Sequence, residues 1–341
     1  MARLDRARIA LRRLLDSRLS ATRLPVRPPN VFAGPYVDRA ARLRKDPAGI
    51  AAALADPQAR LLPVWESRNL VQRTSQGWTA GFMSVADRQP IHGRPEDWIL
   101  LGHFQGRPCF ACEACHEESP ATTDGSSYED LRRAAGLLPD DEAGLLAYAR
   151  AMVWWRQRSR HCGACGSPTS VASAGHVARC LNEACGAEQF PRTDPAIIVL
   201  VTDGDRALLG RQAAWPAGRY STIAGFVEPG ESLEDAVARE VLEETGVAVQ
   251  DSSYHSSQPW PFPSSLMIGF TATASPAAAA QPDDELEDVR WFTREDIASG
   301  FPGLPLPQSV SFRLIEDWYD AGADLPLRRT PGVKLWGRPD R

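Results

Sequence analysis

Runs of apolar residues between turn-forming residues predict several strands. Residues 195–201 form an apolar run that suits a buried strand. The turn signal DGD at residues 203–205 follows, and residues 207–210 resume the apolar pattern, so the two runs predict a hairpin. In the N-terminal half, residues 98–101 also favour a strand.

Helical spacing marks four further segments. Residues 232–245 carry the strongest pattern, because Ser232 and Asp235 fit a capping arrangement at its start and Gly246 fits a stop at its end. Residues 128–133, 141–158 and 307–321 also predict helices. Residues 275–284 are rich in Ala and Pro and predict a loop, and residues 323–341 predict a poorly ordered tail.

These elements divide the 341 residues into several parts, since a chain of this length is long for a single core. The fold class that we expect is α+β. An N-terminal α+β domain would cover residues 1–157 and a loop-rich cysteine module residues 158–192. A second α/β domain at 193–322 and the tail at 323–341 complete the chain, and no internal repeat is visible.

The N-terminus is the one basic segment of a chain with a net charge of −5. This charge argues against non-specific coating of nucleic acid, and no apolar run is long enough to cross a bilayer. Within residues 1–25, leucines and an isoleucine could share one helical face, but Arg12, Arg13 and Asp16 interrupt any secretory signal. We therefore expect a surface helix and a cytoplasmic protein, and a targeting or RNA-contacting segment is the alternative.

An acidic cluster on the helix predicted at 232–245 carries the chemistry. Glu240, Glu243 and Glu244 stand at positions i, i+3 and i+4, so their carboxylates share one helical face. Like charges at this spacing destabilise a helix unless a cation binds them, and carboxylate oxygens suit Mg²⁺ or Mn²⁺. Glu231 can reach Arg239 and hold the geometry. An isolated glutamate pair would instead indicate a solvated acidic face.

The whole segment 225–247, GFVEPGESLEDAVAREVLEETGV, resembles the Nudix box. Gly225 and Glu231 are followed by Arg239-Glu240 and then by Glu243-Glu244. The resemblance implies a Nudix α/β/α sandwich with a mixed sheet. It also implies a metal-dependent hydrolase of a nucleoside diphosphate linked to another group. The box itself does not specify that group.

The segment downstream of the box supplies a clue to the substrate. Residues 257–264, SQPWPFPS, resemble the SQPWPFPxS motif of NADH pyrophosphatases, a Nudix family. A rigid polyproline-like loop that only packs on the domain is the alternative. By this resemblance the substrate-binding residues are Gln258, Pro259, Trp260, Pro261, Phe262, Pro263, Ser264 and Ser265, together with Ser311, Phe226 and Phe190.

The resemblance also implies the roles of the acidic residues. Glu240 and Glu244 would be the principal metal ligands, and the backbone carbonyl of Ala224 would complete the coordination sphere. Glu243 and Glu285 would assist or orient water, with Glu285 as a further metal ligand. Neighbouring acidic residues leave the register of Glu285 open, and several glutamates are equally suited to be the general base.

Four of the seven cysteines fit a zinc ribbon. Cys162, Cys165, Cys180 and Cys185 supply enough thiolates for a closed tetrahedral Zn²⁺ site, although the four residues between Cys180 and Cys185 are more than the usual two. NADH pyrophosphatases commonly carry such a ribbon before the Nudix fold. A metal-free remnant or a redox pair is the alternative.

The other three cysteines form a misleading pattern. Cys109, Cys112 and Cys115, with His116, contain a CxxCH string of the kind that attaches haem in exported proteins. Since no export signal is visible, we interpret them as small apolar residues of a strand.

These resemblances imply hydrolysis of NADH or NAD to nicotinamide mononucleotide and AMP. The NAD cap of RNA presents the same bond and is a further substrate. The alternatives are another Nudix substrate such as ADP-ribose, or a zinc-ribbon binding module with an inert Nudix fold. The family also implies a homodimer in which each chain contributes to its partner's site.

Overall fold

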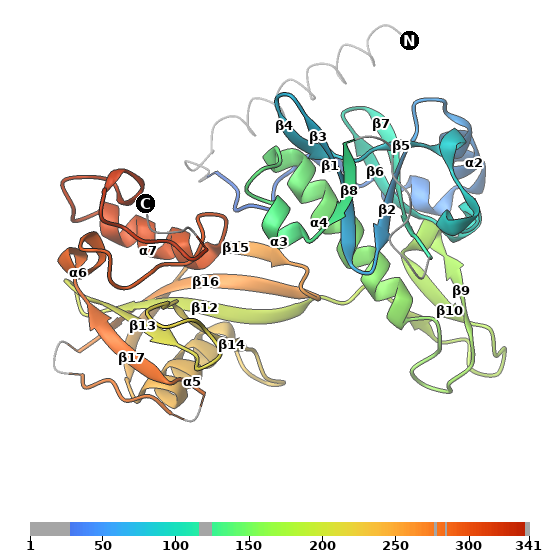
Figure 1. The fold of residues 1–341 in the computed structure, drawn as a ribbon. Coiled ribbons are helices and arrows are strands. Elements are labelled where there is room, and N and C mark those ends of the chain that lie inside the picture. Colours follow the sequence, from blue (N-terminus) through green and yellow to red (C-terminus); the bar gives the residue numbers. More distant parts are fainter. Residues whose placement is uncertain (1–27, 116–124, 276–277, 284, 338–341) are drawn as a thin grey trace, which may run out of the picture.

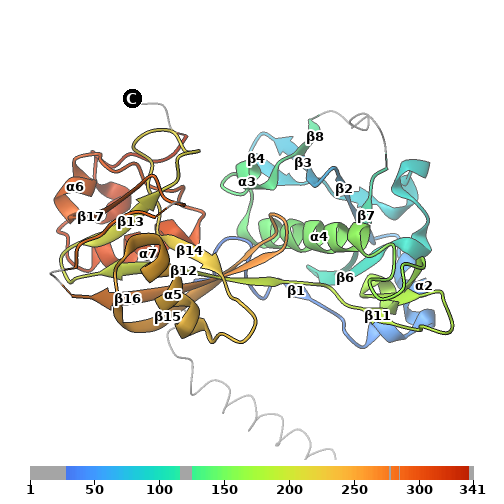
Figure 2. The same cartoon turned by 90° about the horizontal axis from the view of Figure 1, so that it is seen from below.

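The computed structural model describes residues 28–115, 125–275, 278–283 and 285–337 (Figure 1). The basic helix expected within residues 1–25, and His116, lie outside these residues. An N-terminal half and a C-terminal half lie side by side, and a small ribbon adjoins the N-terminal half (Figures 1 and 2).

One sheet organises the described N-terminal half. Its strands follow the order β1-β6-β7-β2-β3-β4, with β5 beside β2 and β8 beside β3. The strands are β1 (Val37–Asp38), β2 (Arg60–Trp65), β3 (Arg68–Thr74), β4 (Gly77–Ala80), β5 (Met83–Ser84), β6 (Ile99–Phe104), β7 (Arg107–Glu113) and β8 (Ser126–Glu129).

The helices α2 (Pro47–Ala55) and α4 (Asp140–Arg158) cover opposite faces of this sheet. The long α4 buries Leu145, Leu146 and Met152 against one face (Figure 2). Cys109 and Cys112 of β7 are buried on the two faces, which confirms them as small apolar strand residues, whereas Cys115 follows the strand and is exposed. The remaining helices here are α3 (Leu131–Ala134) and the 3₁₀ turns η1 (Leu43–Lys45), η2 (Val85–Asp87), η3 (Pro90–His92) and η4 (Pro95–Asp97).

A three-stranded ribbon separates the two halves in sequence. It contains β9 (Thr169–Ala172), the turn η5 (Ser173–Gly175), β10 (Val177–Cys180) and β11 (Glu188–Gln189), all antiparallel.

The C-terminal half is built on a mixed sheet of order β15-β16-β12-β13-β17, with β14 beside β12. The apolar run predicted at 195–201 forms β12, which runs parallel to β16 and antiparallel to β13. Its strands and helices are β12 (Asp194–Thr202), β13 (Ala207–Arg211), β14 (Ile223–Phe226), α5 (Leu233–Thr245), β15 (Val249–Trp260), β16 (Ser265–Ala274), β17 (Asp288–Phe292), α6 (Arg294–Ala298), α7 (Val310–Asp320) and the turn η6 (Leu327–Arg329).

Alternation along β12 produces the α/β/α sandwich. Ile197 and Val199 face the core that α5 covers, and Ile198 and Leu200 face the core that α7 covers. Both faces of the strand are therefore buried, which explains its continuous apolar sequence.

The two halves share one pattern of strand pairing. In the C-terminal half, β12 has a parallel partner β16 and antiparallel partners β13 and β14, while β15 pairs with β16 and β17 with β13. In the N-terminal half, β2 has a parallel partner β7 and antiparallel partners β3 and β5, while β6 pairs with β7 and β8 with β3. The topology is therefore repeated in the same chain order. The turns η2 to η4 stand where α5 stands in the C-terminal half. The expectation of no internal repeat holds for the sequence and is wrong for the fold.

Two predicted elements differ from the structure. Residues 128–133 were expected to be one helix, but Tyr128 pairs with Leu70 in the sheet and only the short α3 follows. The part of the expected tail that the structure describes, residues 323–337, is packed against the C-terminal half. Leu327 is buried in the core beneath α7, and the indole N–H of Trp336 donates to the carbonyl of Gly303 at 2.8 Å. Long-range contacts fix both segments, which local spacing does not reveal.

Within the described residues, no helix combines the length and the apolar character that a membrane span requires.

Candidate active site

Helix α5 presents the acidic cluster. Ser232 caps it and forms a reciprocal capping box with Asp235, and Gly246 ends it in the left-handed conformation with φ of 68°. Its apolar residues Ala236, Val237 and Val241 pack against the sheet, so the glutamates are held on the remaining face. These features confirm the boundaries predicted for this helix.

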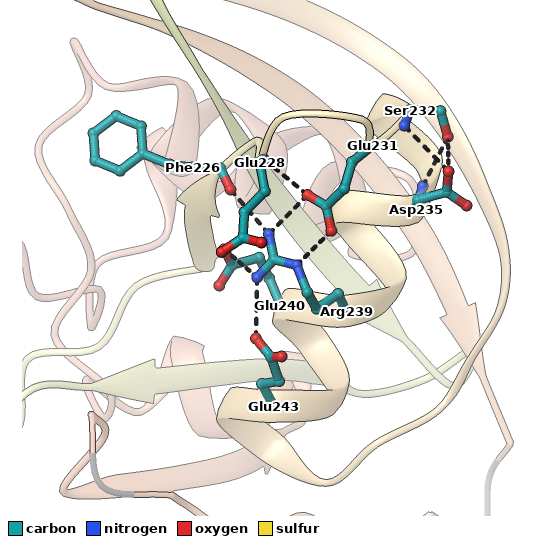
Figure 3. A network of polar contacts seen from close by, with 8 residues as sticks. All are labelled: Phe226, Glu228, Glu231, Ser232, Asp235, Arg239, Glu240 and Glu243. Carbon is teal, nitrogen blue, oxygen red and sulfur yellow. Dashed lines mark hydrogen bonds and ion pairs between the residues drawn. The ribbon is translucent and has the colours of Figure 1, made fainter.

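Arg239 connects the acidic residues (Figure 3). Its guanidinium donates to Glu231 at 2.9 Å, to Glu240 at 2.9 Å and to Glu243 at 3.0 Å, and also to the backbone carbonyl of Phe226 at 3.0 Å. The hydrogen bonds from Arg239 hold the pKa of Glu231 well below its usual range. One arginine therefore fixes the loop before the helix and two carboxylates on it.

Glu244 is the most buried carboxylate of the cluster, with 7% of its surface exposed. Burial, and after it the charges of Glu240, Glu285, Asp283 and Glu243, together raise its pKa to about 8. Among the described residues, no arginine or backbone N–H donates to it. The exposed Glu285 is close enough to act on both Glu240 and Glu244, so the structure brings together all four predicted acidic residues.

Gly225 shapes the space beside these carboxylates. A Cβ atom at this position would lie 1.9 Å from the Cδ of Glu240 and 2.0 Å from its Oε1. Gly225 follows Ala224 on β14, so the Glu240 carboxylate lies against the strand that carries the Ala224 carbonyl. The Glu244 carboxylate, whose pKa is raised and to which no described group donates, lies beside other carboxylates, and such a site fits a hard divalent cation.

A cavity of about 440 Å³ opens beside Glu244. Its lining includes Ala224 and Glu244, and it also includes the aromatic side chains of Trp260, Trp215 and Trp336. The N-terminal half contributes Phe32 and Arg132 to the same lining. The cavity thus combines a carboxylate with flat aromatic surfaces, an arrangement suited to a nucleotide.

The segment 257–264 is partly strand and partly turn. Ser257 to Trp260 continue β15 and pair with β16, and Pro261 to Ser264 form the turn between the two strands. The polyproline-like loop considered as the alternative is therefore wrong for the first half of the segment.

Some residues of this segment face the cavity and others support it. Trp260 and Gln258 line the cavity, but Gln258 is fully buried, and its amide bonds to the backbone of Val31, Gln308 and Val310. Ser264 is buried and donates to Asp194 at 2.6 Å. The remaining residues, Pro259, Pro261, Phe262, Pro263 and Ser265, do not line the cavity.

Ser311 lies at the start of α7 and lines the cavity. Its hydroxyl bonds to Thr222 at 2.8 Å and to Ser221 at 2.9 Å. It therefore fixes the segment that leads into β14.

Phe190 and Phe226 do not line the cavity within this chain. Their side chains are 62% and 60% exposed, and Figure 3 shows the Phe226 ring directed away from the Arg239 network. Conversely, Phe32, Arg132, Trp215 and Trp336 line the cavity, and the sequence prediction missed them. Of these four, Trp215 could have been predicted from the sequence, because it is an aromatic residue shortly before the box. The other three reach the cavity through long-range folding.

The four ribbon cysteines converge as predicted. The Sγ atoms of Cys162, Cys165, Cys180 and Cys185 all lie within 4.8 Å of one another. The Cys162–Cys185 and Cys165–Cys180 separations are 3.9 and 3.5 Å, close to the ~3.8 Å edge of a tetrahedral Zn–thiolate site. The wider spacing before Cys185 therefore does not prevent convergence, and the cluster fits a structural Zn²⁺.

Comparisons with known proteins agree with this geometry. Three family models match the chain. They are the NADH pyrophosphatase-like rudimentary NUDIX domain at residues 58–155, the NADH pyrophosphatase zinc ribbon domain at 157–190 and the NUDIX domain at 192–310. The NAD-capped RNA hydrolase NudC of Mycobacterium bovis is 38% identical over 82% of this chain and 92% of its own. This chain belongs to the NADH pyrophosphatase family of Nudix hydrolases.

Two other relatives are similar to it. The NAD-capped RNA hydrolase NudC of Stutzerimonas stutzeri is 41% identical over 65% of this chain and 81% of its own. That of Pseudomonas aeruginosa is 39% identical over 74% and 92%. The N-terminal half of this chain thus contains a second, rudimentary Nudix unit, which accounts for the repeated topology and for the absence of an acidic helix between β5 and β6.

Proposed function

We propose that this chain hydrolyses the pyrophosphate of NADH and NAD, releasing nicotinamide mononucleotide and AMP, and that it removes NAD caps from RNA by the same cleavage. One observation carries the proposal: Glu244 of the Nudix box and Trp260 of the SQPWPFPS segment line the same cavity. The names of the relatives support the substrate, because they describe NAD-capped RNA hydrolases.

The catalytic cation would be held by Glu240, Glu244 and Glu285 with the Ala224 carbonyl. Bound Mg²⁺ or Mn²⁺ would polarise the phosphoryl oxygens and lower the pKa of a coordinated water. Arg239 holds Glu240 and Glu243 by ion pairs, so the positions of these carboxylates are set before substrate arrives. Glu243 is 58% exposed and is held by Arg239, and it would orient water from that position.

The flat bases of the substrate would bind the aromatic walls of the cavity. Trp260 offers a ring from the substrate-binding segment, and Gln258, Ser264 and Ser311 hold the surrounding backbone through buried hydrogen bonds. The prolines at 259, 261 and 263 limit the freedom of the turn, so its order is established before binding.

Phe190 and Phe226 have a different place in the proposal. Both rings are exposed in the single chain, and exposed aromatics often mark an interface. We assign them to a homodimer in which they approach the partner's substrate. Sedimentation analysis tests this step, since a monomer at micromolar concentration would exclude it.

The decisive experiment is product analysis. The protein is incubated with NADH, NAD, ADP-ribose and NAD-capped RNA, with Mg²⁺ or Mn²⁺, and the products are separated. Nicotinamide mononucleotide from NADH or NAD, together with 5′-monophosphate RNA from the capped RNA, supports the proposal. Faster turnover of ADP-ribose than of any NAD compound would replace NAD by another diphosphate. No turnover of any compound would favour the inert binding module.

A further inference from the structure

The turn that follows Trp260 is held by the N-terminal half. Arg150, on α4, donates from Nε to the backbone carbonyl of Pro261 at 2.7 Å. The Cζ of the same guanidinium lies 4.8 Å from the centre of the Phe262 ring. One side chain therefore contacts two consecutive residues of the substrate-binding segment, one through a hydrogen bond and the other through a cation–π contact.

Arg150 makes these contacts from a costly position. It is 8% exposed, and no described carboxylate lies within ion-pair distance of it. Burial lowers its pKa to about 10, against the weaker, opposing effect of Asp130. A buried cation without a paired anion is destabilising unless its hydrogen bonds and ring contacts compensate. Two groups that compensate the charge of Arg150, the Pro261 carbonyl and the Phe262 ring, belong to the substrate-binding segment.

Other residues of the N-terminal half contact the same segment. Phe32 is buried with its ring centre 6.1 Å from Trp260 and 5.9 Å from Phe262, and it lines the cavity itself. Arg132 lies over the Phe262 ring at 4.5 Å. The amide of Asn30 donates to the carbonyl of Ser257 at 2.8 Å. Both ends of the segment are thus attached to residues outside the C-terminal half.

We propose that the N-terminal half is a working part of the substrate site, with Arg150 as a positioning residue that sets the turn at Pro261–Phe262 and through it the Trp260 ring. This inference rests on the proposed function. It assigns the rudimentary Nudix unit a role in substrate binding, although it lacks an acidic helix of its own. Arg150 does not line the cavity, so its effect on substrate passes through the turn.

The test compares Arg150→Met with Arg150→Lys and with the matched control Arg158→Met, in the full-length, zinc-loaded protein. Arg158 lies on the same helix but is exposed and contacts Trp154 instead of the turn. We expect Arg150→Met to raise KM for NADH by about tenfold and to change kcat less than about threefold, because ground-state positioning is lost while the carboxylate cluster is intact. Lysine keeps a donor but not the planar face, so Arg150→Lys lies between Arg150→Met and the wild type. Arg158→Met leaves KM unchanged.

Binding of nicotinamide mononucleotide, measured by calorimetry, gives a readout that does not depend on turnover. It should weaken in parallel with KM for Arg150→Met. A wild-type KM and a wild-type affinity for nicotinamide mononucleotide in folded Arg150→Met protein would overturn the inference, as would a fall in kcat alone. If Arg150→Met does not fold, Arg150→Lys decides by the same criteria. A wild-type protein that leaves NADH and NAD intact would instead contradict the proposed function, so the two failures are distinguishable.

Discussion

The carboxylate of Glu240 lies directly against the α-carbon of Gly225, with 1.9 Å between the Glu240 Cδ and the place where a Cβ on Gly225 would stand. The absence of a side chain on β14 thus admits a carboxylate from α5. Glu240 is at the same time hydrogen-bonded by Arg239, so it cannot move away without losing that contact. The Glu240 carboxylate of α5 thus occupies the space that a side chain on β14 would fill, which explains why the predicted box begins with glycine.

Gly225→Ala should therefore impair activity more than folding. The new methyl group displaces the Glu240 carboxylate, while the flexible side chain can swing aside without disturbing the core. We expect a loss of about 100-fold or more in kcat/KM and a melting temperature within a few degrees of the wild type. Gly144→Ala is the matched control. Its Cβ would meet only ordinary contacts at 3.6 Å, so its activity should be unchanged. Normal activity in Gly225→Ala would show that Glu240 need not occupy this position.

Glu244→Gln separates metal binding from stability. The amide keeps the size of the side chain but removes a buried negative charge among like charges. Turnover at saturating Mg²⁺ should fall by more than ~100-fold. Residues that only support a metal ligand cost up to about this much when they are changed, and a direct ligand should cost more. Without divalent cations, and above about pH 8 where the Glu244 carboxylate is ionised, the variant should be at least as stable as the wild type, because the repulsion is relieved. Added Mg²⁺ should raise the melting temperature of the wild type more than that of the variant. Near-normal turnover would sink the assignment of Glu244 as a ligand.

The amount of zinc bound per chain tests the zinc ribbon. We expect about one zinc per chain, held by Cys162, Cys165, Cys180 and Cys185. Cys180→Ser should release it and lower the melting temperature by ~10 °C, because the free energy of metal binding contributes to folding. Cys115→Ser changes an exposed thiol outside the cluster and should do neither. Elemental analysis that finds no zinc, or iron in its place, would contradict the expectation.

Segments whose structure is fixed by residues close in sequence were predicted correctly, and segments fixed by residues distant in sequence were not. The limits of α5 follow from Ser232, Asp235 and Gly246, which act within one helical turn of its ends, and they were predicted correctly. The cysteine cluster was also predictable, since metal ligands impose their own spacing.

Distant contacts account for what the sequence did not reveal. Trp336 lies in a stretch of Pro, Gly and basic residues with no periodicity, and its contacts with Gly303, Leu304 and Trp215 hold it at the cavity. Gln258 belongs to a recognisable segment, but its burial depends on Val31 and Gln308. A repeated topology without a repeated motif was invisible for the same reason, because pairing between strands is recorded in no local pattern.

A buried histidine should make stability fall on acidification. His176 is 8% exposed and bonds to the backbone carbonyl of Leu100 at 2.8 Å. Burial lowers its pKa from 6.5 to about 4. Above pH 6.5 neither the folded nor the unfolded state is protonated there, so the group has no effect on the pH dependence. Between pH 6.5 and 4 the unfolded state takes up the proton first, and the free energy of unfolding falls by up to ~3 kcal/mol.

His176→Gln isolates this contribution. The amide can still donate to Leu100 but does not titrate in this range. Denaturant unfolding at about pH 8 first gives the packing cost of the change. As the pH falls toward 4, the free energy of unfolding of the wild type should fall more than that of the variant. A constant difference across that window would show that His176 is not the group responsible.

Trp260 should discriminate between dinucleotides, because its ring lines the cavity beside Glu244 whereas Phe226 is exposed in the single chain. Stacking of one base on an aromatic ring contributes roughly 1–3 kcal/mol. Trp260→Ala should accordingly lower kcat/KM for NADH by about 5- to 100-fold and lower that for ADP-ribose, which lacks the nicotinamide, by less. Inhibition by nicotinamide mononucleotide should weaken in the same variant, and inhibition by AMP should not. Phe226→Ala should show the same preference only where the protein is a dimer, so its effect should diminish on dilution. Trp154→Ala, on the outer part of α4, serves as the control for loss of an indole. Equal losses on both dinucleotides, with a lowered melting temperature, would mean that the Trp260 ring only packs against Phe32 and Phe262.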